Sequence, residues 1–104
     1  MKYKLKYQTR QPVESYIAAA TSYIASLTKL YDEHELIGIL SSVSDEVMSL
    51  AASSIKGITA NPECDIDDAS KSLVVYNTNG REILTVWFER IYDREQNPAQ
   101  IRKL

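Results

Sequence analysis

The alternation of apolar and polar residues is clearest near the end of the chain, over residues 72–92. Two alternating runs flank Asn79 and Gly80, and Asn-Gly is the pair that best tolerates the positive φ angles of a two-residue type I′ turn. The pattern therefore predicts a β-hairpin in which Thr78 pairs with Arg81, and this pair fixes the register of the two strands. The predicted cross-strand pairs are Ser72 with Trp87, Leu73 with Val86, Val74 with Thr85, Val75 with Leu84, and Tyr76 with Ile83.

Both faces of this predicted hairpin are largely apolar. One face carries Leu73, Val75, Leu84, Val86 and Phe88, and the other carries Val74, Tyr76, Ile83 and Trp87. One layer of helices covers only one face of a sheet, so we expect the second face to lie against another protein or a second copy of the chain. Tryptophan, tyrosine and arginine are typical of binding hot spots. The predicted partner-binding residues are Tyr76, Arg81, Ile83, Trp87 and Arg90.

A further strand is predicted at the start of the chain, over residues 2–7. Lys2, Lys4 and Lys6 fall on one face of this strand, and apolar or aromatic residues fall on the other. Lysines are typical of an edge strand that is protected from unwanted pairing. We expect this strand to join the hairpin in one antiparallel sheet.

Spacings of three and four residues predict helices between these strands. An apolar stripe spans residues 12–31, and Pro12 suits the first turn of a helix. Asp32 and Glu35 resemble a capping box, which predicts a second, short helix over residues 33–40.

The segment 36–40 (Leu-Ile-Gly-Ile-Leu) is also compatible with a strand. A third helix is predicted over residues 45–56, and residues 59–71 are predicted to form a loop. The fold class is therefore α+β, one domain over residues 1–104 in the order β-α-(α)-α-β-β, with a three-stranded antiparallel sheet packed on two or three helices. The predicted core comprises Leu5, Ile17, Ile24, Leu27, Val47, Ala51, Ile55, Leu73, Val75, Leu84, Val86 and Phe88.

The composition is that of an ordinary globular protein, with 44% hydrophobic and 25% charged residues. The chain has one cysteine, so it forms no internal disulfide, and a reducing, cytoplasmic setting is expected. No run of about 18 apolar residues is present, so no membrane-spanning helix is expected. The first ten residues also lack the apolar segment of a secretory signal.

The net charge of −2 is unevenly distributed along the chain. The first ten residues carry four basic residues and no acid, whereas residues 11–70 carry ten acids and two bases. Lys2, Lys4 and Lys6, together with aromatic residues of the sheet, make a nucleic-acid-binding regulatory protein the alternative function. The sequence pI of about 5.3 argues against that alternative.

No motif for catalysis, a cofactor or a metal is found in the sequence. Cys64 lies between Glu63 and Asp65, whose charges disfavour the thiolate, and His34 lies in an acidic surface segment. The acidic segment 63–68 lacks the spacing of a calcium-binding loop. The sequence therefore predicts a small non-enzymatic protein without cofactors that binds a protein partner or forms a homodimer. An inhibitor, immunity or accessory regulatory protein is expected, of the kind carried by phages and mobile elements.

Overall fold

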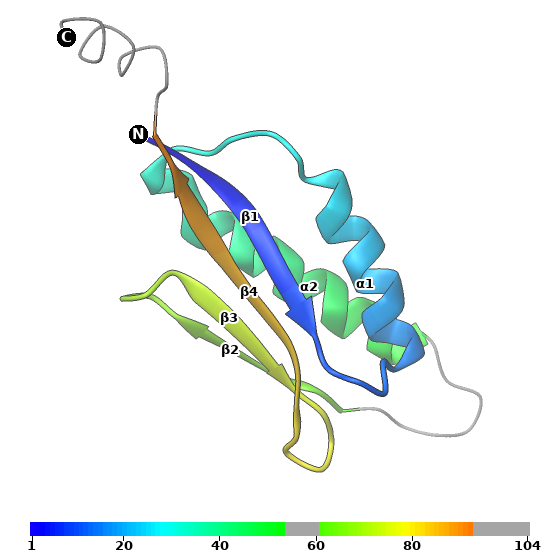
Figure 1. Cartoon of the computed structure of the whole chain (residues 1–104). Helices are drawn as coiled ribbons and strands as arrows, with labels where there is room; N and C mark the ends of the chain where they lie inside the picture. The colour runs from blue at the N-terminus through cyan, green and yellow to red at the C-terminus, as the bar shows by residue number, and fades with distance from the viewer. Residues whose placement is uncertain (54–60, 93–104) are drawn as a thin grey trace, which may run out of the picture.

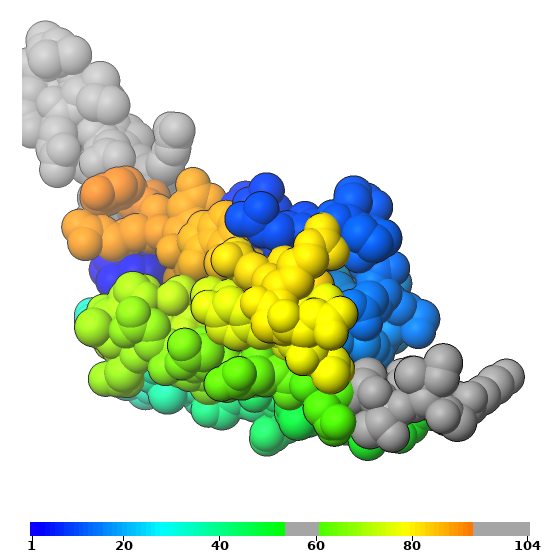
Figure 2. Space-filling view, turned by 90° about the horizontal axis from the view of Figure 1, so that it is seen from below, coloured from blue at the N-terminus to red at the C-terminus, as the bar shows by residue number. Residues whose placement is uncertain are grey.

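The computed structural model describes residues 1–53 and 61–92 and has an α+β architecture, in which an antiparallel sheet packs on one layer of helices (Figure 1). The elements are β1 (Lys2–Thr9), α1 (Ser15–Ser26), the 3₁₀ turn η1 (Glu33–Glu35), α2 (Leu36–Ser53), β2 (Glu63–Asp67), β3 (Ser72–Tyr76) and β4 (Glu82–Ile91). The strand order is β1-β4-β3-β2, so β1 and β2 form the two edges of the sheet. Figure 2 shows these layers from the end at which the hairpin turn (yellow) lies, with α2 (teal and green) along the lower side.

The sheet contains four strands within the described residues, where the sequence pattern predicted three. The missed strand is β2, which lies in the segment predicted to be a loop. Its sequence Glu-Cys-Asp-Ile-Asp does alternate: Cys64 and Ile66 pack against the core, and the acids are exposed. The many acidic residues of this segment suggested a loop, although its period-two alternation is typical of a half-buried edge strand.

The predicted N-terminal edge strand and its antiparallel pairing with the hairpin are confirmed, because β1 pairs with β4. The hairpin register is confirmed for the three pairs Leu73–Val86, Val74–Thr85 and Val75–Leu84. The predicted pair of Tyr76 with Ile83 is wrong. Tyr76 pairs instead with Glu82, and Ile83 is the additional residue of a β-bulge at this point of β4.

The hairpin turn differs from the predicted type I′ turn. The carbonyl oxygen of Asn77 accepts the Gly80 N–H at 2.8 Å, and the Asn77 N–H donates to the Arg81 carbonyl at 2.8 Å. The Asn77 side-chain oxygen accepts the N–H groups of Asn79 and Arg81, each at 2.9 Å. Gly80 has φ +82°, while Asn79 has no positive φ. The loop therefore has three residues and ends in a left-handed glycine, and Thr78 does not pair with Arg81.

Helix α1 ends at Ser26, five residues before the end of the apolar stripe that predicted a helix over residues 12–31. The chain turns at Leu27 and returns to the sheet, where Tyr31 forms a β-bridge with Tyr3. The N–H of each of these two residues donates to the carbonyl oxygen of the other at 2.9 Å. Pairing with the outer edge of β1 thus replaces the helical hydrogen bonds of Tyr31, a tertiary effect that local spacing does not reveal.

The second and third predicted helices are one continuous helix, α2, preceded by η1. The predicted capping box is confirmed, and Glu35 Oε1 accepts the Asp32 N–H at 2.8 Å. Gly38 does not break the helix, because one glycine costs only about 1 kcal/mol, and one apolar stripe keeps the same side toward the core throughout. The stripe comprises Leu36, Leu40, Val43, Val47 and Ala51. The predicted helix end at Lys56 and the core residue Ile55 lie outside the described residues.

The joined segment Glu33–Ser53 is long and apolar enough, by length and composition, to cross a membrane, with a mean hydropathy of 1.3. The sequence pattern predicted two separate helices in this segment, and neither of them has this combined length. A core helix gives the same signal, and here the buried side of α2 belongs to the hydrophobic core.

Both helices cover the same face of the sheet, which is the face that carries Leu73 and Val86. The core predictions are confirmed as buried for Leu5, Ile17, Ile24, Val47, Ala51, Leu73, Val75, Leu84 and Val86. Leu27 and Phe88 are only partly buried but pack against this core. The core also includes residues that were not predicted, namely Tyr16, Ala20, Leu40, Val43 and Ile83.

Candidate protein-binding surface

The sheet face opposite the helices, termed here the open face, is not covered by any helix in the described part of the chain (Figure 1). Strand alternation and register define its members: Lys2, Lys4, Lys6 and Gln8 on β1, Thr85, Trp87, Glu89 and Ile91 on β4, Ser72, Val74 and Tyr76 on β3, and Glu63, Asp65 and Asp67 on β2. All four strands therefore contribute side chains to the open face.

The centre of the open face is apolar and aromatic. Val74 lies between Asp65 of β2 and Thr85 of β4, and Trp87 lies beside Lys6 of β1. Tyr76, Val74 and Trp87 are half-buried by their neighbours within the sheet, so each keeps some surface exposed to solvent. A partner that covers this centre would remove the remaining apolar surface from water.

The two edges of the open face carry opposite charges. The β1 edge presents Lys2, Lys4 and Lys6, and the β2 edge presents Glu63, Asp65 and Asp67. Charge therefore changes sign across the sheet, with the apolar centre between the two edges. The uneven distribution of charge along the sequence therefore corresponds to a separation of positive and negative charge on one face of the sheet.

Ion pairs at the basic edge leave its lysines exposed. Lys2 Nζ lies 2.8 Å from Asp32 Oδ1, and Lys6 Nζ lies 3.6 Å from Glu89 Oε1. The hydrogen bond from the Lys2 ammonium holds the pKa of Asp32 below its usual value, and the same bond raises the pKa of Lys2. Pairs this exposed contribute little to stability, so the lysine charges remain available to a partner.

The five predicted partner-binding residues do not lie on one face. Tyr76 and Trp87 are on the open face, as expected. Ile83 is 1% exposed, so its expected place on that face is wrong, because the β-bulge turns its side chain into the core. The Arg81 guanidinium donates to the Gln11 carbonyl and holds the turn against the segment before α1. Arg90 pairs in register with Tyr3 and lies over the Tyr92 ring, 5.3 Å from its centroid.

Residues that the sequence reasoning missed complete the open face. Val74 was assigned to the correct face but not to the site, and Asp65 was placed in a loop. The alternation of residues 63–67 was the signal that could have found the acidic edge.

Cys64 and His34 lie in surroundings that do not favour catalysis. Cys64 is half-buried on the helix-facing side of β2, and burial raises the pKa of its thiol, with the charge of Asp45 acting in the same direction. His34 is exposed in η1. Within residues 1–53 and 61–92, no three histidine, cysteine or acidic side chains converge as metal ligands would.

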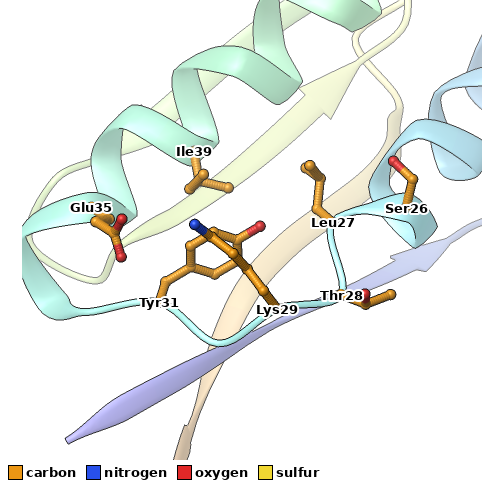
Figure 3. Close-up of a pocket in the computed structure, with 7 residues that line it drawn as sticks. All are labelled: Ser26, Leu27, Thr28, Lys29, Tyr31, Glu35 and Ile39. Atoms are coloured by element: carbon orange, nitrogen blue, oxygen red, sulfur yellow. The ribbon is translucent and has the colours of Figure 1, made fainter.

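A shallow pocket of about 350 Å³ lies on the other side of the molecule, between the end of α1 and the start of α2 (Figure 3). It is lined by Ser26, Leu27, Thr28, Lys29, Tyr31, Glu35 and Ile39. Its charged groups serve the fold: Lys29 Nζ lies 5.3 Å from the Tyr31 ring centroid, and Glu35 caps η1. These contacts hold the 27–32 segment in place, so the pocket is a weaker candidate site than the open face.

The open face has the composition of a contact surface, with aromatic and aliphatic side chains at its centre and charged side chains around them. Comparison with known proteins finds no matching family model, no similar protein among the curated sequences and no similar solved structure.

Proposed function

We propose that this protein is a small, non-enzymatic, cytoplasmic protein that acts by binding another protein through the open face. An inhibitor, immunity protein or accessory regulator, of the kind carried by phages and mobile elements, fits this mode of action. One observation carries the proposal: a whole face of the sheet has no helix of the described chain over it, yet Trp87 and Tyr76 occupy it. An antiparallel sheet commonly leaves one face to solvent, but that face is then polar, whereas aromatic residues at its centre are typical of a contact surface.

The arrangement of the face supports protein binding over small-molecule binding. Hot spots form where tryptophan or tyrosine at the centre of a patch is surrounded by residues that exclude water. Trp87 has Lys6 beside it, and Val74 has Asp65 beside it, so polar side chains surround the apolar centre. Sheet faces are flat, whereas sites for small molecules are concave.

Affinity capture from the native host with the full chain as bait tests this proposal. We expect the wild-type chain to retain a specific protein that Trp87→Ala loses, because removing the indole deletes the largest apolar group of the open face. Met48→Ala is the matched control, since Met48 is 44% exposed on α2, in the helix layer. Mass spectrometry identifies the retained proteins, and circular dichroism checks that each variant is folded.

The outcomes separate clearly. Retention by wild type and by Met48→Ala, but not by Trp87→Ala, supports binding through the open face. Equal retention by all three chains would mean that the contact lies elsewhere. Retention of no specific protein, together with a monomeric bait, would leave the open face without a binding role and would overturn the proposal.

Nucleic-acid binding is the second candidate, and the register of β1 with β4 favours it by placing Lys6 beside Trp87. A lysine next to a partly exposed aromatic ring suits stacking of a single-stranded base with a nearby phosphate. The acidic β2 edge on the same face opposes it. Fluorescence anisotropy with a labelled single-stranded oligonucleotide distinguishes the two functions, since phosphate binding weakens steeply with salt.

A further inference from the structure

We infer that the open face pairs with the open face of a second copy of this chain, with the lysines of β1 in each copy over the acids of β2 in the other. The inference rests on the proposed function, because it requires the open face to be a protein-binding surface. It names the partner and the orientation, which the proposed function leaves open.

The charge order across the sheet selects this partner. The strand order β1-β4-β3-β2 places the lysines and the acids at opposite edges of one face. The register also separates them along the strands: Lys6 is level with Asp67, but Lys4 lies beyond this level toward one end of the strands and Asp65 toward the other. The lysines and the acids therefore occupy diagonally opposite corners of the face, and a two-fold axis that lies between two facing sheets and runs diagonally to the strands exchanges these corners. An axis along the strands would bring only Lys6 over the partner's Asp67. The first arrangement is self-complementary, and two-fold symmetry then forms both charged contacts at once.

The centre of the face fits the same arrangement. Strands β4 and β3 are the two inner strands, so the axis crosses them at the centre of the face. Trp87 lies on β4 at the level of Lys6 and Asp67, between the two charged corners, so it lies close to the axis and beside Trp87 of the other copy. The half-buried side chains of both copies would cover one another, while the long lysine side chains cover the margins. Apolar contact supplies affinity, and the charged edges select the orientation.

The size of the face predicts a weak dimer. Four strands about 4.8 Å apart and about six residues long give a face of roughly 400 Å² in projection on each copy. The pair therefore buries roughly 800 Å² in total, which lies in the range below about 1,200 Å² that is typical of weak, transient contacts. Dissociation constants of about 1–100 µM are expected. At lower concentrations the face is free to bind a different protein.

Charge reversal at one edge at a time tests the orientation. Lys4→Glu/Lys6→Glu makes both edges of the face acidic, and Glu63→Lys/Asp65→Lys makes both edges basic. Asp67 is left unchanged, because it accepts the Ala69 N–H at 2.9 Å and the Ser70 N–H at 3.3 Å within the turn after β2. Sedimentation velocity of the full chain at about 200 µM and low salt measures the dimer against the expected micromolar range.

The wild type should be a dimer at this concentration, and each double variant alone should dissociate at least about tenfold more readily. An equimolar mixture of the two variants should restore a dimer, because an all-acidic face then meets an all-basic one. Asp45→Lys, which reverses an exposed charge on α2, should leave wild-type dimerisation unchanged. Circular dichroism verifies the fold of each variant. If a variant unfolds, the wild-type dimer alone remains informative, since its affinity must fall as salt rises.

Three results would overturn the inference: a monomeric wild type, a dimer that reversal at either edge leaves intact, or two variants whose mixture does not associate. A monomeric wild type that still captures another protein in a Trp87-dependent manner would remove the second copy as partner and leave the proposed function standing. Capture that ignores Trp87 would remove the proposed function itself.

Discussion

Ile83→Ala should lower the free energy of unfolding by about 3 kcal/mol, because it leaves a cavity in the core. Ile83 is 1% exposed and lies among the residues of the main core cluster. Trp87→Ala should cost only about 1 kcal/mol, since that side chain is only partly buried and no helix in the described chain covers it. Urea denaturation followed by circular dichroism measures both values.

The pair of variants separates the core from the open face. Ile83→Val serves as the control, and it should cost about 1 kcal/mol because only one methylene group is lost. A loss for Trp87→Ala as large as that for Ile83→Ala would place the indole in the core. Such a result would contradict the assignment of Trp87 to a surface used for binding.

Tyr31→Ala should cost about 3 to 4 kcal/mol. The Tyr31 side chain is 2% exposed, and its ring meets the Phe88 ring edge-on, with centroids 6.3 Å apart and an interplanar angle of 75°. The backbone of Tyr31 is hydrogen-bonded to that of Tyr3. Loss of the ring therefore also weakens the attachment of the 27–32 segment to the outer edge of β1. Thermal or urea unfolding measures the loss.

Tyr31→Phe is the control for this prediction, because it keeps the ring and removes only the hydroxyl. It should change the free energy of unfolding by less than about 1 kcal/mol. If Tyr31→Ala were equally mild, the 27–32 segment would not be fastened to the sheet as described. The outer edge of β1 would then be open to pairing with another strand.

Short-range alternation was sufficient to predict most of the sheet and its buried face. Strands β1, β3 and β4 follow from residues two apart, and three hairpin pairs follow from them. The bulge at Ile83 does not follow from this alternation. It accompanies a loop that is one residue longer than predicted, in which the Asn77 side chain accepts hydrogen bonds from two N–H groups. The end of α1 at Ser26 also escaped prediction, since the distant edge of β1 determines it through Tyr3.

The candidate site was predictable only in part for the same reasons. Alternation placed Tyr76 and Trp87 on one face correctly, since a period of two is a local property. Arg81 and Arg90 were assigned by closeness in sequence, but Arg81 turns toward Gln11 and Arg90 toward Tyr92. The opposite charges of the two edges emerge only from the strand order, which brings segments about sixty residues apart onto one surface.

The indole N–H of Trp87 offers the most direct test that the open face binds protein. The chain has a single tryptophan, so this group gives one resonance in a nitrogen-correlated NMR spectrum. The resonance should shift as the protein concentration rises from about 20 µM to about 1 mM, the range in which a weak dimer forms, or when a captured partner is added. The methyl resonance of Met48, on α2, should stay in place. An indole resonance that never moves while association is observed, or a Met48 methyl that moves in its place, would contradict the assignment of binding to this face.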